Sequence, residues 1–336
     1  MQLFGMVNVL LGQSRTSNNA QIHRFPVIPI SNNIGLLGWV ENANTINNTI
    51  CNYRANISHV RSHHESSVLR NYVESFGQWE RLTIIQRAEV LDYVMNCPDC
   101  EAVDVARAMW HRSNTAEQWL ERRAVFTTSL ASMSIVGYVF GLGDRHLGNI
   151  LLSMSTGKIV HIDFGDSFDV GRLRHVLPET VPFRLTRMLT NAMEIFGVDG
   201  IFRASATGTQ TTLQKNRDSI MALLSAFVYD PIVQHKGRMK NMMEKSRSPQ
   251  DVVERIRNKL RGVELAVPTS ELVPFNTTTE SCKRPDLLYM SKAFDDNAQR
   301  DQRMALGPDE QVDFLINEAV RPDNYTTLYF GWGPLW

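Results

Sequence analysis

Three polar residues near the middle of the chain have the types and the spacing that phosphoryl transfer from a magnesium nucleotide requires. Asp144 is suited to orient an attacking hydroxyl, and Asn149, five residues later, is suited to bind a metal ion. Asp163 opens an Asp-Phe-Gly sequence fourteen residues after Asn149 and is a second candidate metal ligand. A lone Asp-Phe-Gly would be weak evidence, because any strand can end in this way. The apolar segment 159–162 before Asp163 makes the combination specific.

These residues need helices and strands to hold them. The twenty uncharged residues at 124–143 have the length of a membrane span, but they contain Ser, Thr and Gly and lead directly into the Asp144 loop. We therefore predict a buried helix. The pattern from 45 to 123 is helical, and two further amphipathic segments lie at 183–189 and 220–229. Together these segments predict a helical lobe.

A β-hairpin is predicted near the start of the chain. The apolar segments 24–30 and 35–40 flank a polar turn at 31–33. The second strand ends at Trp39, whose ring offers a flat surface for adenine, while the backbones of Gly38 and Val40 can pair with the adenine edge. The alternative is that Trp39 is an ordinary core residue.

Composition indicates a globular protein of 336 residues with 35 basic and 35 acidic side chains. Because these charges balance, the net charge does not favour binding to a nucleic acid or an anionic membrane, and no nucleic-acid partner is predicted. Four sparse cysteines favour a reducing compartment, the cytoplasm or the nucleus. The Cys97–Cys100 pair lacks the further ligands of a zinc site and predicts a helix-end loop. The apolar start at 1–11 has no basic flank and predicts a core helix.

The C-terminal third changes character twice. Residues 236–304 are polar and charged, which predicts a mobile insert or linker with one helix at 252–260. A second helix is predicted from Pro308, with Val312 and Ile316 on its apolar face. The uncharged aromatic segment 325–336 follows. It predicts either packing into the parent domain or docking to a partner or a membrane, which leaves endomembrane association open.

The order Asp144-Arg145-His146, in place of His-Arg-Asp, resembles the phosphatidylinositol 3-kinase-related protein kinases. The segments 141–149, 161–168, 182–194 and 329–336 are most similar to the TOR kinases of that family. The resemblance implies an α+β fold of the atypical protein kinase (PI3/PI4-kinase-like) type, mainly the helical C-lobe, with a remnant of the N-lobe sheet and a C-terminal FATC segment. The implied division is as follows: N-lobe remnant and hinge 1–40; C-lobe 41–235, with docking insertion 58–87, catalytic loop 141–149 and activation segment 163–186; variable regulatory insert 236–304; FATC 305–336.

The resemblance also implies roles for the candidate site residues. ATP would transfer its γ-phosphoryl group to Ser or Thr of a protein, in growth and nutrient signalling. Asp144 would act on the substrate hydroxyl, and His146 would lie beside the transferring phosphoryl group, unless it is only a solvated loop histidine. Mg²⁺ or Mn²⁺ would be held by Asn149 and Asp163. The residues expected around the adenine are Gly38, Trp39, Val40, Leu151 and Ile162.

The same resemblance implies partner subunits, and it also shows where this chain differs from the family. The insertion 58–87 would dock a WD-repeat β-propeller subunit, and scaffold subunits of a TOR complex are expected. The family's phosphate-binding lysine has no counterpart, because the first lysine is Lys158. We therefore expect a fragment of a longer protein that alone binds nucleotide weakly. Thr326, Leu328 and Gly333 stand where TOR tails often carry cysteines, so no disulfide switch is expected.

Two other functions remain open. A phosphoinositide kinase would need a dense basic cluster in the activation segment. That segment contains Arg172, Arg174 and His175, but also acidic residues and no lysine, so a lipid substrate is disfavoured. A catalytically inactive scaffold is the alternative if the protein begins at Met1, because the docking helices and the tail remain while most of the N-lobe is missing.

Overall fold

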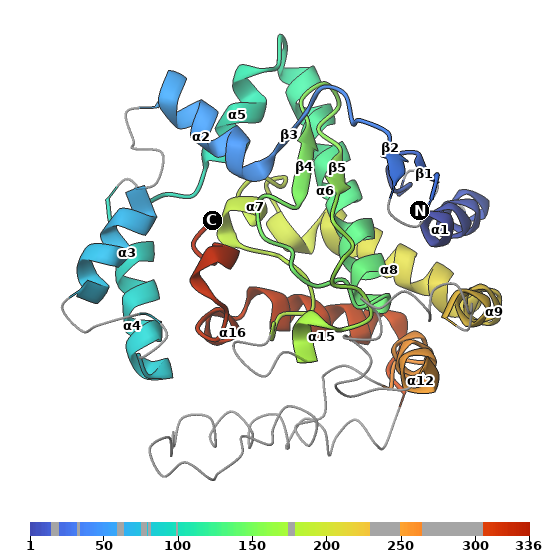
Figure 1. Ribbon diagram of the computed structural model, residues 1–336. Helices are drawn as coiled ribbons and strands as arrows, with labels where there is room; N and C mark the ends of the chain where they lie inside the picture. Colours follow the sequence, from blue (N-terminus) through green and yellow to red (C-terminus); the bar gives the residue numbers. More distant parts are fainter. Residues whose placement is uncertain are drawn as a thin grey trace, which may run out of the picture.

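Helix α6 (Ala116–Val139) is the centre of the fold, and the Asp144 loop begins at its end (Figure 1). Its first turn is capped by the side chain of Thr115, which accepts from the backbone of Gln118. From Phe126 to Val139 nearly every residue is buried. The predicted buried helix is thus confirmed. Among the described residues, no helix has the length and hydrophobicity that crossing a bilayer would require.

The computed structural model describes residues 1–14, 20–31, 34–58, 64–74, 79, 82–98, 100–173, 179–228, 249–263 and 305–336. Parts of the predicted docking insertion and most of the polar insert lie outside these residues, as do Arg174, His175 and Cys282.

A three-stranded antiparallel sheet frames the predicted metal ligands. Its order is β3 (Ala43–Thr45), β4 (Ile150–Ser153) and β5 (Ile159–His161). Strand β4 begins directly after Asn149, and β5 ends two residues before Asp163, with Leu151 opposite Val160 in the register. Helix α6 supports the sheet, because the backbone N–H of Ile159 donates to the Ser129 hydroxyl at 2.9 Å. The predicted apolar strand before Asp163 is confirmed.

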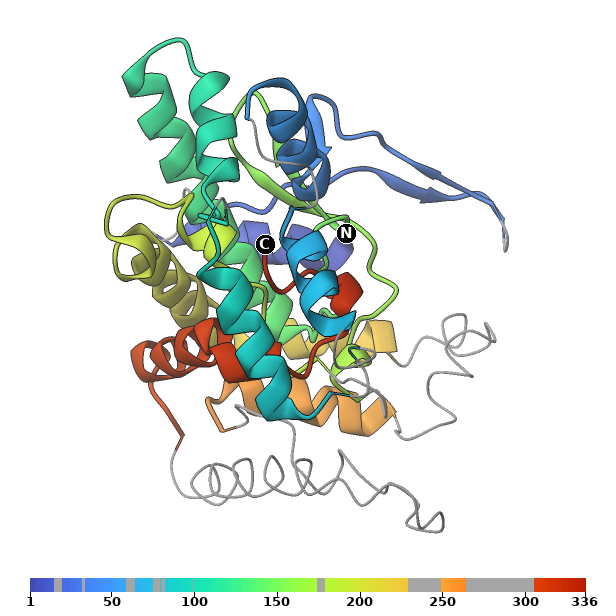
Figure 2. The same ribbon diagram turned by 90° about the vertical axis from the view of Figure 1, so that its left-hand side faces the viewer.

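The predicted hairpin is also present. Strands β1 (Val27–Pro29) and β2 (Gly35–Leu37) pair antiparallel and extend away from the body of the molecule (Figure 2). Both strands are exposed along their whole length. Trp39, just after β2, is 88% exposed and is therefore not a core residue.

Helices make up most of the rest of the described chain, as the sequence predicts. Helix α15 packs against α8, and α8 packs against α6 (Figure 1). The other described helices are α1 (Gln2–Gln13), α2 (Ile46–Asn56), α3 (His64–Glu74), α4 (Ile84–Met95), α5 (Asp104–His111), α7 (Arg187–Thr190), α8 (Ile201–Lys215), α9 (Arg217–Val228), α12 (Pro249–Leu260), α15 (Pro308–Val320) and α16 (Pro322–Tyr325), with short 3-10 helices η2 (Gly171–Leu173), η3 (Gly197–Asp199) and η4 (Phe330–Trp332).

Several smaller predictions can be compared with these helices. The apolar start of the chain forms α1 and buries Phe4, Val7 and Leu11, as expected of a core helix. The Cys97–Cys100 pair follows the end of α4, as expected of a helix-end loop. Burial raises the pKa of Cys100 to about 11, so this thiol stays protonated at neutral pH.

The segment 183–189 differs from its amphipathic prediction. Only its last residues are helical, in α7, while residues 182–186 form an irregular and almost fully buried stretch. Pro182 disfavours a helix at the residue before it, and the Arg184 side chain points across the domain to bind backbone carbonyls of the chain end. Burial of both faces therefore replaces amphipathic packing here.

The polar segment 236–304 contains the helix predicted in it, and its residues before 249 and after 263 lie outside the described ones, so the predicted mobility stays a prediction. Its predicted helix is present as α12, and Val253, Ile256 and Leu260 are buried against the lobe. Lys259 is 1% exposed and donates to both carboxylate oxygens of Asp169 at 2.8 Å. This buried ion pair attaches the insert helix to the activation segment.

An ion triad fastens α3 to its neighbours. The guanidinium of Arg54 on α2 donates to Glu65 of α3 at 2.6 Å and to Asp104 of α5 at 2.6 Å. Burial alone would raise the pKa of Glu65, but the hydrogen bond and charge of Arg54 hold it below its usual value. The same guanidinium lies over the Trp336 ring, 5.3 Å from its centroid. Arg54 therefore connects Glu65, in the predicted docking insertion, to the chain end.

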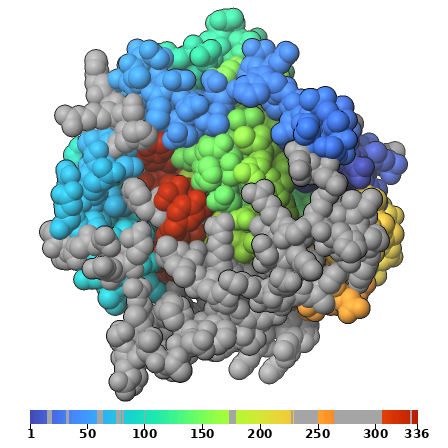
Figure 3. All heavy atoms as spheres, in the orientation of Figure 1, coloured from blue at the N-terminus to red at the C-terminus, as the bar shows by residue number. Residues whose placement is uncertain are grey.

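The aromatic tail packs into the domain. Leu328, Trp332, Leu335 and Trp336 are each at most 5% exposed. In Figure 3 the red C-terminal residues lie between the α3 region and the green catalytic region. Of the two readings of the tail, packing is the one observed. The possible membrane contact through the tail stays a prediction, and the Trp332 and Trp336 rings, being buried, are not available for it in this conformation.

The Asp169–Lys259 pair generates a stability prediction. We expect Asp169→Asn to lower the free energy of unfolding at pH 7 by about 3–5 kcal/mol, because Lys259 is left buried without a counter-charge. Burial alone would raise the pKa of Asp169, but the positive charges of Lys259, Arg255 and Arg172 lower it, and the net result is a pKa below the usual value. The carboxylate therefore stabilises the fold above about pH 4 and loses this effect as the pH falls through its folded pKa.

Urea unfolding at pH 7 and at acidic pH measures this effect. The matched control is Glu101→Gln, which removes the charge of an exposed pair with Arg107 and should cost less than about 1 kcal/mol. Equal losses for the two variants would contradict the prediction, as would an unchanged acid dependence in Asp169→Asn.

Candidate active site

The catalytic loop is held against the activation segment by backbone hydrogen bonds. The N–H groups of Phe168 and Asp169 donate to Phe140 and Gly141 at 2.9 and 2.8 Å, and Gly143 donates back to Asp166 at 2.7 Å. Gly141 has a φ of +59°, and a Cβ there would lie 2.3 Å from the Asp169 nitrogen. Only glycine fits this crossing, which brings residues 141–149 beside the residues that follow Asp163.

Asp144 is fixed through three of its polar groups. Its backbone N–H donates to Glu179 at 2.7 Å, and its carbonyl accepts from the Asn149 side chain at 2.9 Å. Its carboxylate oxygen Oδ1 accepts from the Tyr329 hydroxyl at 3.1 Å. The backbone of Asp144 is left-handed, with φ +56°, an uncommon conformation for a residue other than glycine. Such conformations concentrate at functional sites.

Asp163 lies beside this loop in a similar conformation, with φ +54°. Its Oδ1 accepts from the backbone of Gly165 at 3.0 Å, and its side chain is exposed to the cleft. The buried Arg145 connects the two loops, because it donates to the carbonyls of Gly143 and Ile162 at 2.7 and 2.8 Å and also to that of Asp163. The sequence motif is thus one hydrogen-bonded unit.

A cleft of about 1040 Å³ opens between the hairpin, the three-stranded sheet and Asp163. The five residues that we predict around adenine all line it, from three different parts of the chain: Gly38, Trp39, Val40, Leu151 and Ile162. Asp144, His146 and Asn149 lie outside its lining, beyond Asp163. Ile162 joins the two groups, because its N–H donates to the Asn149 carbonyl at 3.0 Å. The structure therefore brings the predicted residues together, while their roles stay predictions.

The donor set suits a magnesium ion shared with a nucleotide. The side-chain amide N–H of Asn149 donates to the Asp144 carbonyl, so the side-chain oxygen of Asn149 remains to bind a metal. Asp163 has one carboxylate oxygen beyond the Gly165 contact. Within the described residues, no cluster of three His, Cys, Asp or Glu forms a complete protein cage. Mg²⁺ in kinase sites takes one or two protein ligands together with phosphates and waters, so these two residues fit.

His146 is held inside the catalytic loop. Its Nδ1 accepts from the backbone N–H of Gly148 at 3.0 Å. A Cβ at position 148 would lie 2.8 Å from the imidazole, so the glycine permits this contact. The ring is half-buried next to Asp144. Its place beside a transferred phosphoryl group stays a prediction.

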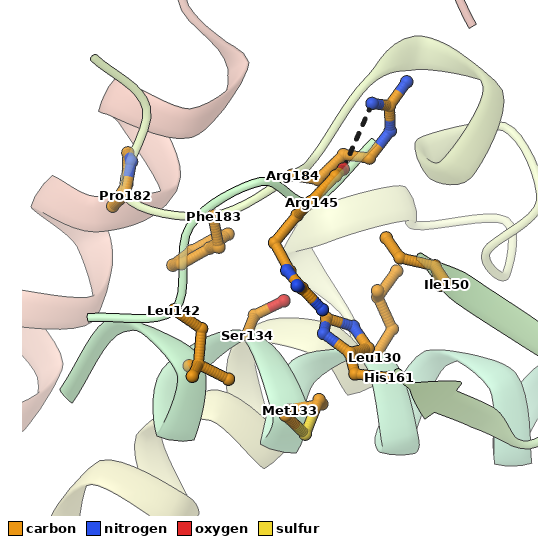
Figure 4. Close-up of a pocket in the computed structure, with 11 residues that line it drawn as sticks. Leu130, Met133, Ser134, Leu142, Arg145, Ile150, His161, Pro182, Phe183 and Arg184 are labelled. Carbon is orange, nitrogen blue, oxygen red and sulfur yellow. Dashed lines mark hydrogen bonds between the residues drawn. The ribbon is translucent and has the colours of Figure 1, made fainter. Parts of the chain in front are cut away.

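A small cavity of about 10 Å³ lies behind the loop (Figure 4). His161 and Arg145 face each other in it, and Arg184 donates to the Arg145 carbonyl at 3.3 Å, the contact dashed in Figure 4. Burial and the neighbouring Arg145 lower the pKa of His161 well below its usual value, so the imidazole is neutral at pH 7. His161 is therefore part of the packing behind the site.

The chain end is bound to the same loop by Arg184. This guanidinium is 2% exposed and donates to the carbonyl of Trp332 at 2.6 Å and to a main-chain oxygen of the last residue, Trp336, at 2.8 Å. It also lies 4.2 Å from the centroid of the Trp332 ring. Burial lowers the pKa of Arg184 to about 9, which leaves it charged at neutral pH. Carbonyls at the chain end are satisfied by this one cation.

Sequence reasoning missed Glu179 and Tyr329 at the site. Glu179 is an ordinary acidic residue of the activation segment, and Tyr329 lies 185 residues from Asp144, so no local spacing connects either one to Asp144. The only available signal was the uncharged aromatic composition of the tail, for which packing into the domain was one of the alternatives, with no indication of the residues it would contact. From the sequence, Arg145 is only the middle residue of the Asp144-Arg145-His146 order, and its bonds to the Asp163 segment were not predicted.

Comparison with known proteins agrees with this geometry. The family model described as phosphatidylinositol 3- and 4-kinase matches residues 1–237, and the FATC domain model matches residues 305–336. Among solved structures, the FAT and kinase domain of CtTel1 superposes with a TM-score of 0.67 at 24% identity, over 100% of this chain and 20% of that one. This likeness concerns the fold.

Curated relatives match along the whole chain. The serine/threonine-protein kinase mTor of Drosophila melanogaster is 34% identical over 362 residues, and TOR2 of Saccharomyces cerevisiae is 36% identical over 362 residues. TOR of Arabidopsis thaliana is 35% identical over 383 residues. Each match covers 100% of this chain but only 14 to 15% of the relative. By fold and by sequence, the chain belongs to the phosphatidylinositol 3- and 4-kinase family, as a TOR-like member with a C-terminal FATC domain.

Proposed function

We propose that the protein to which this chain belongs is a serine/threonine protein kinase that transfers the γ-phosphoryl group of ATP to protein substrates in growth and nutrient signalling. The observation that carries the proposal is the hydrogen-bonded unit of Asp144, Asn149 and Asp163 at the edge of the Trp39 cleft. The names of the TOR relatives support the same reaction.

Each candidate site residue has a proposed role that follows from its position. Trp39 and Ile162 contact the adenine in the cleft, which places the phosphates near Asp163. Asp144 orients the substrate hydroxyl for attack and accepts its proton. His146 stabilises charge on the transferred group. A divalent cation held by Asn149 and Asp163, Mg²⁺ or Mn²⁺, would supply charge neutralisation at the phosphates when bound.

The division of the chain follows the same proposal. Residues 1–40 supply the hairpin and hinge of the N-lobe, 41–235 the C-lobe, 236–304 a regulatory insert and 305–336 the FATC segment. The family-model ranges are compatible with these limits. A cytoplasmic or nuclear location, with assembly into a TOR complex through scaffold subunits, completes the proposal.

A WD-repeat β-propeller subunit is proposed to dock on the insertion 58–87, which contains α3 and the first turn of α4. The ion triad at Arg54 and Glu65 holds α3 rigid, and rigid surfaces lose little entropy on binding. Ile85 on α4 is 71% exposed and gives the surface an apolar anchor. Trp79 and Arg87 of the same insertion donate to tail carbonyls at 3.4 and 3.1 Å, so docking would also support the tail.

Phosphorylation of a Ser/Thr peptide by the protein purified from cells tests the reaction. We expect Asp144→Asn to lower kcat by about 10²–10⁴-fold, because the substrate hydroxyl loses its proton acceptor. Asp163→Ala should abolish transfer by removing a metal ligand. The exposed Asp199→Asn is the control and should leave kcat unchanged. Persisting activity in Asp163→Ala would contradict the metal assignment, and transfer to phosphoinositide alone would contradict the protein substrate.

Nucleotide binding tests the cleft separately from the chemistry. Trp39→Ala should raise the Kd of ATP about tenfold, because the adenine loses a stacking surface. The unfolding midpoint should not change, since Trp39 is 88% exposed. Phe196→Ala, at another exposed aromatic residue outside the cleft lining, is the control. An unchanged Kd, measured with a fluorescent ATP analogue, would exclude Trp39 from the site.

Docking is tested by co-purification with the WD-repeat subunit of the source organism. Ile85→Asp should weaken binding about tenfold or more, because a charge replaces an apolar anchor. Ile195→Asp makes the same change at a residue 90% exposed on another loop and should bind normally. Normal binding by Ile85→Asp, or equal loss in both variants, would contradict docking on α4.

A further inference from the structure

The FATC tail reaches the catalytic carboxylate directly. The Tyr329 hydroxyl donates to Oδ1 of Asp144 at 3.1 Å, a contact between residues 185 positions apart in the sequence. Tyr329 is only partly buried, so its ring borders both the tail and the site. The roles proposed above for Asp144 and its neighbours do not use this hydroxyl.

The tail holds the Tyr329 ring in one place. The Tyr329 carbonyl accepts from Trp332 at 3.0 Å, and Arg184 fixes the Trp332 carbonyl and ring. Gly331 allows the ring to lie close to the backbone, because a Cβ at 331 would be 2.7 Å from Cε2 of Tyr329. The hydroxyl is thus presented to Asp144 from a rigid support.

The remaining contacts of Asp144 define what Tyr329 adds. Glu179 and Asn149 fix its backbone N–H and carbonyl, but neither one restricts rotation of the side chain. Within the described residues, Oδ2 of Asp144 has no hydrogen-bond partner, whereas Oδ1 is bound by Tyr329. With Oδ1 held by Tyr329, Oδ2 is the carboxylate oxygen that remains to accept from a substrate hydroxyl.

We propose that Tyr329 is a positioning residue of the phosphoryl transfer, which keeps the Asp144 carboxylate in the rotamer that receives the substrate hydroxyl. The inference rests on the proposed kinase function and deepens it. Orientation of a reacting group contributes to rate without contributing to nucleotide affinity. A tyrosine that only filled space would contribute to stability instead.

The test compares Tyr329→Phe with Tyr325→Phe in the intact kinase purified from cells. The two variants remove the same atom from the same tail. The Tyr325 hydroxyl donates to the carbonyls of Leu185, at 3.1 Å, and Ala319, away from Asp144. We expect Tyr329→Phe to lower kcat about tenfold with the KM for ATP unchanged, the effect of losing one hydrogen bond to a charged group. Tyr325→Phe should lower the unfolding midpoint and leave kcat per folded molecule unchanged.

Wild-type kcat in Tyr329→Phe would overturn the proposal, as would equal kcat losses in both variants. A double-mutant cycle of Tyr329→Phe with Asp144→Ala, which removes the accepting oxygen, is read by thermal unfolding and tests the contact without relying on activity. Shifts that add would show that the contact is absent and would also overturn the proposal. An inactive wild-type kinase would contradict the proposed function instead, and the cycle would still decide whether the contact exists.

Discussion

The buried guanidinium of Arg184 is the interaction on which the arrangement of the site depends. One cation binds main-chain oxygens of Trp332, Trp336 and Arg145, and it lies against the Trp332 ring. It therefore joins the chain end to the catalytic loop without any exposed contact. Burying a guanidinium is costly unless its donors find partners, and here main-chain oxygens accept from Nη1 and Nη2, while Nε has no partner among the described residues. The position of the tail and that of the loop are thus coupled through one side chain.

Other buried charges complete this framework around the same loops. Arg145 joins the catalytic loop to the Asp163 segment, and Lys259 joins the activation segment to α12. Arg54 joins the docking insertion to α5 and to the chain end. In each case the cation connects segments that are distant in the sequence. The C-lobe is held together around its site by these bonds as well as by its apolar core.

The sequence predicted the elements whose pattern is local. The Asp144 spacing, the apolar strand before Asp163, the hairpin and the helix from Pro308 all depend on neighbouring residues, and these elements are present. The residues around Asp144 from distant segments were not predictable in this way. Tyr329 and Glu179 reach the loop only because the chain end and the activation segment fold back on it, and tertiary hydrogen bonds leave no periodicity.

The left-handed backbones of Asp144 and Asp163 have a consequence for how this fold can change in evolution. Among residues with a Cβ, asparagine and aspartate tolerate this region best, and glycine adopts it freely. An exchange of either aspartate for asparagine or glycine would therefore remove a carboxylate that the proposed phosphoryl transfer uses, while the backbone kept its shape. Catalytic loss and structural loss are separable in this lobe, so a descendant without activity could persist as a folded binding platform.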